Sequence, residues 1–334
     1  MTTLAADLPT DYLSKEHTIT SWLLTRDHKR IALLFFGSIT FFFFVGGFMA
    51  TLIRLQLVEP NGSLFQPDVY NRIFTMHGIT MVWFFLIPSI PATLGNFLVP
   101  LQIGAHDLAF PRLNLLSWYL FNLSGLVLLY AFFIGGPDTG WTFYPPYSTL
   151  FSNSHVLPAA IAVFINGFSS IATGLNFVVS IHKLRAPGMT WFRLPLFIWG
   201  LYAVSLLLLL ATPVLAMTLA LTAVGRFMGV GIFDPALGGD PIFFQHMFWF
   251  YSHPAVYIMV LPAMGLVSEL ITCFSRRHIF GYKGMCFALI AIAVISFFVW
   301  GHHMFIAGIS IMSAVVFSLM TFIVAVPSAI KVFN

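Results

Sequence analysis

Long apolar stretches alternate with short polar loops along most of the chain. An α-helix needs about 20 residues to cross the roughly 30 Å hydrocarbon core of a membrane, and eight stretches are long enough. The pattern predicts an all-α, polytopic membrane helical bundle, in which residues 1–30 form a tail and residues 31–334 form one membrane domain. The predicted spans cover residues 31–55, 72–100, 113–135, 156–182, 192–222, 241–273, 284–306 and 309–331.

The composition excludes several other classes of protein. Of the 334 residues, 59% are hydrophobic and only 8% are charged, whereas roughly 25% are charged in an ordinary soluble domain. A water-soluble globule could not hide so much apolar surface. Cys273 and Cys286 are too few for a disulfide scaffold and belong to no Cys/His cluster. The net charge of +4 comes from residues in short loops, so we expect no nucleic-acid partner.

The basic residues predict how the bundle is oriented. Lys and Arg are enriched in the cytoplasmic loops of membrane proteins. Twelve of the fifteen fall on one side of the predicted spans, and the exceptions are Arg54, Arg72 and Arg226. We therefore expect a cytoplasmic N-terminus.

Histidines inside the predicted spans are candidate functional groups, because ionisable side chains are costly in hydrocarbon. His253 lies about 18 Å into the sixth span at ~1.5 Å per residue, and His302 and His303 lie in the outer half of the seventh. These three rings can therefore meet, while His77 in the second span lies shallower. An interhelical hydrogen bond would explain any one of them. The triple favours a site for copper, zinc or iron, and the lack of a nearby cysteine disfavours structural zinc.

Two further side chains are placed where they could serve such a site. Tyr257 follows His253 by four residues and shares its helix face, so it could supply a proton and an electron. The alternative is a hydrogen-bonded core tyrosine. Arg54, near the end of the first span, could bind an acidic group of a buried cofactor, although a snorkelling arginine is the simpler interpretation.

Two sets of polar residues could conduct protons from the cytoplasmic side. Asp107 lies in a loop on that side, and Asn and Ser residues on neighbouring spans could hold water above it. A second set lies on the cytoplasmic halves of the sixth and eighth spans. Isolated Ser and Asn residues also commonly join helices by hydrogen bonds, which is the alternative. The first set is Asn96, Asn114, Ser169, Ser170 and Asn176, and the second is Ser268, Ser328 and Lys331.

Long motifs around these residues resemble a known family. They are WFYSHPAVY at 249–257, WGHHMF at 300–305, MHG at 76–78, GWTFYPP at 140–146 and FDPALGGDP at 233–241. With these motifs in register from about residue 30 to the end, the sequence resembles the catalytic subunit (subunit I) of the heme–copper oxygen reductases of the cytochrome c oxidase type.

The resemblance implies cofactors and their ligands. His253, His302 and His303 would ligate copper B, and Tyr257 would be cross-linked to His253. Two hemes, of the heme a type, would also be bound, and His77 would be an axial ligand of the low-spin heme. The other cofactor-binding residues would be Arg54, Trp141 and Trp249.

The resemblance also implies a reaction and partners. Dioxygen would be reduced to water by four electrons, with protons pumped across a bacterial cytoplasmic (inner) membrane. Asp107 would open one proton path, and Lys331, Ser328, Ser268 and Tyr257 would form the other. Electrons would come from cytochrome c, a subunit II would carry a binuclear copper site for electron entry, and a subunit III would complete the assembly.

The sequence departs from the family pattern at two points. Many members carry a glutamate at the position of Ala255, and here we expect the hydroxyls of Tyr251 and Ser252 to take over its relay role. The family has about twelve spans and the later ones carry the remaining heme ligands, whereas eight are predicted here. We therefore expect the sequence to be part of a longer chain.

Other functions are open on the sequence alone. Quinol oxidases carry an Arg and an Asp in the outer half of the first span, where residues 45–49 read VGGFM, so cytochrome c is favoured as donor. A nitric oxide reductase is disfavoured by the position of Tyr257. A transporter that relays protons through the histidines would bind neither heme nor copper, and a non-catalytic membrane fragment is the last alternative.

Overall fold

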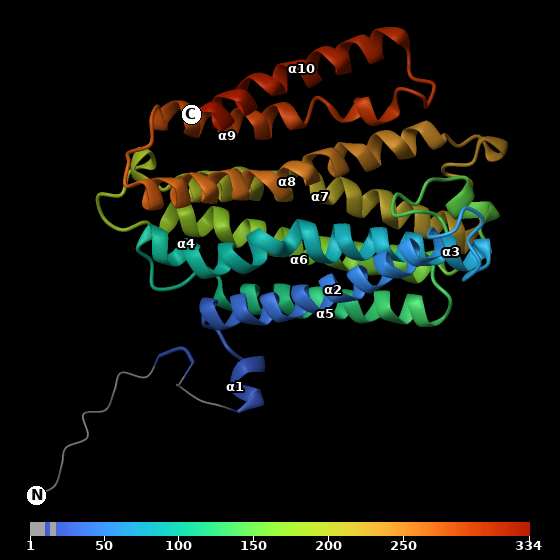
Figure 1. Cartoon of the computed structure of the whole chain (residues 1–334), viewed down its shortest axis with the longest axis horizontal. Helices are drawn as coiled ribbons and strands as arrows, with labels where there is room; N and C mark the ends of the chain where they lie inside the picture. Colours follow the sequence, from blue (N-terminus) through green and yellow to red (C-terminus); the bar gives the residue numbers. More distant parts are fainter. Residues whose placement is uncertain (1–10, 14–17) are drawn as a thin grey trace, which may run out of the picture.

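The computed structural model describes residues 11–13 and 18–334. In this part of the chain the regular structure is entirely helical, and eight helical segments are long and apolar enough to cross a membrane. They run side by side, with α9 and α10 at one edge of the bundle and α2 and α5 at the other (Figure 1). The predicted all-α bundle with eight spans is confirmed.

The spans begin and end close to the predicted positions, and short elements lie in the connections. The spans are α2 (His28–Gln56), the segment Pro67–Ile103, α5 (Pro111–Phe133), α6 (Val156–Lys183), α7 (Leu196–Met228), α8 (Pro241–Ser275), the segment Tyr282–Met304 and α10 (Ile311–Phe333). The short elements are α1 (Ile19–Leu23), η3 (Tyr147–Phe151), η4 (Trp191–Arg193) and η5 (Pro235–Leu237).

Side-chain caps set two of the helix starts. The carboxylate of Asp27 accepts from the backbone N–H of Lys29 at 2.8 Å, and that of Asp240 accepts from Ile242 at 2.8 Å. Acidic caps of this kind satisfy N–H groups that have no partner inside the helix. Because of the Asp27 cap, α2 begins within the predicted tail 1–30, most of whose remaining residues lie outside the described part of the chain.

The second span is not the single regular helix that the sequence predicts. It consists of α3 (Pro67–Ile79), the π-helical segments η1 (Thr80–Leu86) and η2 (Ser89–Gly95), and α4 (Asn96–Ile103). Pro88 and Pro91 have no backbone N–H to donate, so the ordinary hydrogen-bond pattern cannot continue through them. π-helical turns widen a helix and are frequent at functional sites.

The seventh span is interrupted just before its two histidines. α9 (Tyr282–Ser296) ends, and after residues 297–299 the chain forms a 3₁₀ turn, η6 (Trp300–Met304). Gly301 in this turn lies so close to α10 that a Cβ atom would fall 2.2 Å from the Phe317 ring. The continuous helix predicted over residues 284–306 is therefore wrong beyond Ser296, because a turn packed against α10 replaces its end.

α7 lies at the centre of the bundle, packed against both α6 and α8. A Cβ atom on Gly200 of α7 would lie 2.7 Å from the carbonyl oxygen of Leu261, and one on Gly265 of α8 would lie 2.6 Å from that of Leu196. Small residues at such crossings allow two helix backbones to approach closely. This contact fixes α8, and with it His253, in the interior.

Candidate metal centre

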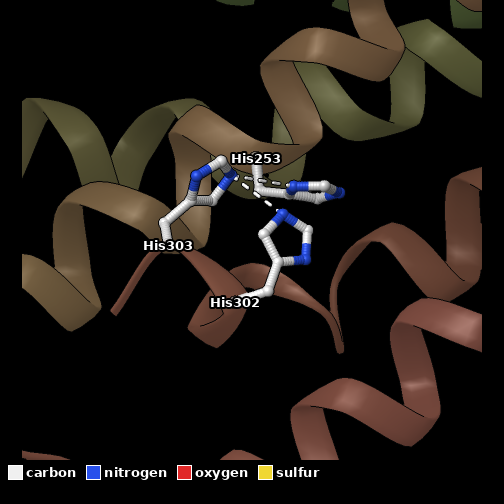
Figure 2. Close-up of side chains that lie close together, drawn as sticks. All are labelled: His253, His302 and His303. Carbon is white, nitrogen blue, oxygen red and sulfur yellow. Dashed lines mark hydrogen bonds between the residues drawn. The ribbon is translucent and has the colours of Figure 1, made fainter. Parts of the chain in front are cut away.

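Three histidine side chains from two elements converge, and of these His253 is buried while His302 and His303 are partly exposed (Figure 2). His253 comes from α8, whereas His302 and His303 come from η6. Nδ1 of His253 lies 3.2 Å from Nε2 of His303, and the Nε2 atoms of His302 and His303 lie 3.1 Å apart. One nitrogen from each ring lies within 4.8 Å of the others. The structure thus brings the three rings together, as their predicted depths indicate.

The donor set fits a metal ion. Two nitrogens that bind one ion at about 2 Å lie roughly 3 to 3.5 Å apart, which matches the observed separations. Thr321 Oγ1 donates its proton to the carbonyl oxygen of Phe317 at 2.7 Å and lies 3.0 Å from Nδ1 of His302. With the hydroxyl proton assigned to the Phe317 bond, Nδ1 of His302 is the donor to Oγ1, and its Nε2 presents a lone pair to the other rings. Imidazole lone pairs of this kind bind copper, iron or zinc.

Aromatic side chains surround the three rings. The ring centroid of Tyr257 lies 4.9 Å from that of His253, as expected from their spacing. Trp249 stacks on His303 with ring centroids 3.9 Å apart and an interplanar angle of 11°, and its indole N–H donates to the hydroxyl of Tyr144. Nε2 of His253 is buried and has no hydrogen-bond partner among the described residues. That nitrogen is therefore available for a further bond.

His77 does not belong to the cluster of three. Its Nδ1 lies 2.9 Å from the carbonyl oxygen of Gly46 on α2, so Nδ1 carries the proton and Nε2 has the lone pair. Histidines that ligate metals commonly donate their other N–H in this way. A Cβ atom at Gly46 would lie 2.5 Å from Sδ of Met81, so a larger residue there would require the Met81 side chain to move. The hydrogen bond to Gly46 thus fixes the ring of His77 and leaves the lone pair on Nε2.

The predicted cofactor-binding residues occupy different environments. Trp141 packs edge-on against Trp249, with ring centroids 5.9 Å apart, and it covers Gly78, where a Cβ atom would lie 3.2 Å from Cβ of Trp141. Trp141 therefore contacts both the residue after His77 and the Trp249 ring that stacks on His303. Arg54 is exposed in the last turn of α2, as a snorkelling arginine would also be.

Asp107 lies half-buried in the loop between α4 and α5. Burial raises the pKa of its carboxyl group, against the opposing effect of the Leu108 N–H, which donates to it at 2.6 Å. Asn176 uses its amide oxygen and nitrogen to bond the backbone N–H and oxygen of Phe110 at 2.9 and 3.1 Å. Asn176 therefore holds the end of this loop against α6.

Other residues of the first predicted proton path have polar atoms with no protein partner. Both amide atoms of Asn114 and Oδ1 of Asn96 are buried without a hydrogen bond to any residue that the structure describes. Buried groups of this kind are normally paired with internal water. Ser169 and Ser170 line, with Asn166, a cavity of about 20 Å³, which has room for about one water molecule.

The second predicted path contains one direct contact. Nζ of the buried Lys331 donates to Oγ of Ser268 at 2.5 Å. Ser328 instead donates to the carbonyl oxygen of Val324, one turn earlier in α10. A cavity of about 490 Å³ between α8 and α10 reaches both Lys331 and Ser268. Neighbouring Glu269 accepts from the backbone N–H of Leu196 at 2.7 Å.

The Tyr251–Ser252 pair is buried beside a tryptophan. The rings of Trp83 and Tyr251 stack, with centroids 5.6 Å apart and an interplanar angle of 17°. The carbonyl oxygen of Trp83 accepts from the Asn166 amide at 2.8 Å. Nε1 of Trp83 and Oγ of Ser252 are both buried with no partner in the described part of the chain. These unpaired atoms extend the polar interior from Asn166 toward α8.

Sequence reasoning missed four residues of this site. Trp83, Asn166 and Thr321 lie on apolar spans, where their types are equally typical of helix packing. Tyr144 was present in the GWTFYPP motif, but its contact with Trp249 depends on how the loop folds back over α8.

Fold and site together define a polytopic helical membrane protein with a partly buried tri-histidine candidate metal centre. Residues 30–334 match the family described as Cytochrome C and Quinol oxidase polypeptide I, and the chain belongs to this family.

Individual relatives agree with this assignment. Cytochrome c oxidase subunit 1 of Bacillus subtilis is 43% identical over 315 residues, which are 94% of this chain and 50% of the relative. The protein of the same name from Thermostichus vulcanus is 42% identical over 308 residues, or 92% and 56% of the two chains. A probable cytochrome c oxidase subunit 1-alpha of Streptomyces avermitilis is 40% identical over 332 residues, or 98% and 57%. The chain thus spans about half the length of these relatives.

Proposed function

We propose that the chain forms the oxygen-reducing part of a terminal respiratory oxidase, which reduces dioxygen to water with electrons from cytochrome c and pumps protons. The observation that carries this proposal is the convergence of one nitrogen from each of three histidines within 4.8 Å, with a tyrosine beside them. Family membership supports the reaction class.

Copper B is held in this proposal by Nδ1 of His253 and the Nε2 atoms of His302 and His303. Copper in such a site, with the hemes, supplies electrons to dioxygen. Tyr257 supplies a proton and an electron from a ring 4.9 Å from His253. The unpaired Nε2 of His253 supports a covalent link to the Tyr257 ring, whose formation removes one hydrogen from each residue, two electrons in all, with dioxygen as the oxidant.

Two hemes of the heme a type complete the proposed cofactor set. His77 would hold the low-spin heme through Nε2, and the hydrogen bond from Nδ1 to the Gly46 carbonyl oxygen orients the imidazole ring. Trp141, which contacts Gly78 beside His77 and Trp249 beside His303, would pack against these cofactors. Arg54 would contact the heme periphery, and Trp249 packs beside His303.

Protons reach the centre by two paths in this proposal. The first begins at Asp107 and continues past Asn96, Asn114, Ser169 and Ser170, and the unpaired amide atoms of Asn96 and Asn114 support water there. Asn176 positions the entrance loop. The second path begins at Lys331 and Ser268, which are in contact, and continues past Ser328 to Tyr257.

The relay at the top of the first path is formed by Tyr251 and Ser252. Ala255, which is buried, has no group that could carry a proton. The unpaired Ser252 Oγ and Trp83 Nε1 support water beside the Tyr251 hydroxyl, and a hydroxyl can pass a proton along such a chain.

The proposed location is a bacterial inner membrane with the N-terminus in the cytoplasm. The enrichment of Lys and Arg in the loops at one side of the spans supports this orientation. The proposed partners are membrane lipid, cytochrome c, a subunit II with binuclear copper and a subunit III.

The test uses the oxidase complex purified with its companion subunits. Wild type should contain one copper B and two hemes, and should consume oxygen with reduced cytochrome c. His302→Gln should lose copper B and activity, whereas His182→Gln, at an exposed position in the last turn of α6, should keep both. A complex with neither heme nor copper would overturn the proposal in favour of a transporter. Oxygen consumption with quinol but not with reduced cytochrome c would overturn the proposal that cytochrome c is the electron donor.

A further inference from the structure

Arg226, in the last turn of α7, holds together the long loop between α5 and α6. Its guanidinium donates to three backbone carbonyl oxygens of that loop, those of Ser148 at 2.7 Å, Ser152 at 2.8 Å and Ser154 at 2.9 Å. A planar fork of five N–H donors suits this geometry, whereas a lysine ammonium has a single flexible nitrogen. Arg226 therefore joins one side of the loop to α7.

Asp138 lies in the same loop and binds three of its hydroxyl groups. Its carboxylate accepts from the hydroxyls of Ser152 and Ser154 at 2.6 Å each and of Tyr147 at 2.7 Å. Burial alone raises the pKa of this carboxyl group, but the three hydroxyl donors outweigh it and lower the pKa overall. The ionised form is thus the one that the loop binds. Arg226 thus binds the backbone carbonyl oxygens of Ser152 and Ser154, and Asp138 binds their hydroxyls.

Tyr144 and Trp141 of this loop contact Trp249, which lies beside the candidate metal centre. Tyr144 accepts the indole N–H of Trp249, and Trp249 stacks on His303 with ring centroids 3.9 Å apart. Trp141 of the same loop contacts Trp249 from the edge. A stacked ring at this separation is at van der Waals contact, so a displacement of Trp249 must move the imidazole or open a gap beside it.

We propose that Arg226 and Asp138 are positioning residues for the His303 ligand. They fix the loop, the loop fixes Tyr144, and Tyr144 fixes the Trp249 ring that supports the imidazole. Neither residue touches the centre itself. The inference rests on the proposed function, since it concerns the copper-binding arrangement of His303.

The test is made on the purified, fully assembled complex with Arg226→Lys and Asp138→Asn. The matched control is Arg185→Lys: Arg185 also donates to two backbone carbonyls, those of Met189 and Ile181, but in the loop at the opposite end of the bundle. The readout is the infrared stretching band of carbon monoxide on cuprous copper, which reports the arrangement of the three imidazoles. Copper content is measured in parallel.

Arg226→Lys and Asp138→Asn should both keep their copper and show a shifted or broadened carbon monoxide band. Their oxygen consumption should fall about tenfold, the lower end of the range for changes in the surroundings of metal ligands, and Arg185→Lys should match wild type. If Arg226→Lys fails to assemble, Asp138→Asn, at a partly exposed loop position, carries the test. A carbon monoxide band at the wild-type position and width in the assembled Arg226→Lys and Asp138→Asn complexes would overturn the inference.

A double-mutant cycle tests the route. Tyr144→Phe removes the acceptor of the Trp249 N–H, so adding Arg226→Lys to it should shift the band no further than Tyr144→Phe alone. Two full, additive shifts would overturn the route through Tyr144. Absence of copper from wild type would overturn the proposed function and this inference together, whereas a copper-loaded wild type with unshifted variants would overturn only the inference.

Discussion

Replacing Thr321 with valine removes one hydroxyl group and nearly preserves the shape of the side chain. That hydroxyl is fixed by its bond to the Phe317 carbonyl oxygen at 2.7 Å and accepts from Nδ1 of His302 at 3.0 Å. It therefore sets both the tautomer and the orientation of His302. In Thr321→Val the Nδ1–H loses this partner, and the Nε2 lone pair is no longer held toward the other two rings.

The magnitude follows from the hydrogen bond that is lost. One such bond contributes about 0.5–1.5 kcal/mol net, and about 1.4 kcal/mol corresponds to a factor of ten in affinity. The copper affinity should therefore fall roughly 2- to 12-fold from the bond alone. Reorientation of the ring would bring the loss toward the roughly 100-fold upper range for changes of this kind.

The assay is retention of copper B by the purified complex against increasing concentrations of a copper chelator. Thr218→Val is the matched control, because Thr218 on α7 makes the same hydroxyl-to-carbonyl bond, to Val214 at 2.7 Å, away from the histidines. Thr321→Ser keeps a hydroxyl and should retain copper almost as wild type does. Equal retention by Thr321→Val and Thr218→Val would refute the reasoning.

Three further predictions concern the turn, the loop and the tyrosine. Gly301→Ala places a methyl group 2.2 Å from the Phe317 ring, so it should destabilise the packing of η6 on α10 by about 1–3 kcal/mol and lower the yield of copper-loaded complex; a normal yield and melting temperature would contradict this. Because the folded pKa of Asp138 is lowered, its contribution to stability is present above the ordinary carboxyl pKa and is lost as the pH falls through the folded value. The melting temperature of Asp138→Asn should thus differ from wild type more near pH 7 than near pH 3, and a constant difference would exclude ionisation as its cause. Mass spectrometry of the peptide with His253 and Tyr257 should find it lighter by two hydrogen atoms, and Tyr257→Phe should show the unmodified mass.

The spans and the histidine cluster could be predicted because they depend on local rules. A run of about 20 apolar residues indicates a membrane-spanning helix. The rise of ~1.5 Å per residue then gives the depth of each histidine from the end of its span. His253, His302 and His303 therefore meet as predicted. Which ring nitrogens face inward could not be predicted, since that depends on the Thr321 hydroxyl of another span.

Irregular backbone and side-chain partners could not be predicted for a related reason. After the break at Ser296 the chain forms a turn in which Gly301 packs closely against Phe317, and the hydropathy of the segment does not change there. Asn176 was predicted to hold water, and the hydrogen bonds that it makes with Phe110 appear only once α6 meets the loop. A polar residue on an apolar span signals that a partner exists without identifying it.

The hydrogen bond from His302 to Thr321 has a consequence for proton conduction. The Thr321 hydroxyl donates its hydrogen bond to the backbone oxygen of Phe317. A carbonyl oxygen can accept a hydrogen bond but has no proton to donate. This branch therefore ends at a group that has no proton to give. In the proposed function, we expect a proton delivered beside His253 to have no onward route through His302, which leaves the side where Tyr257 lies.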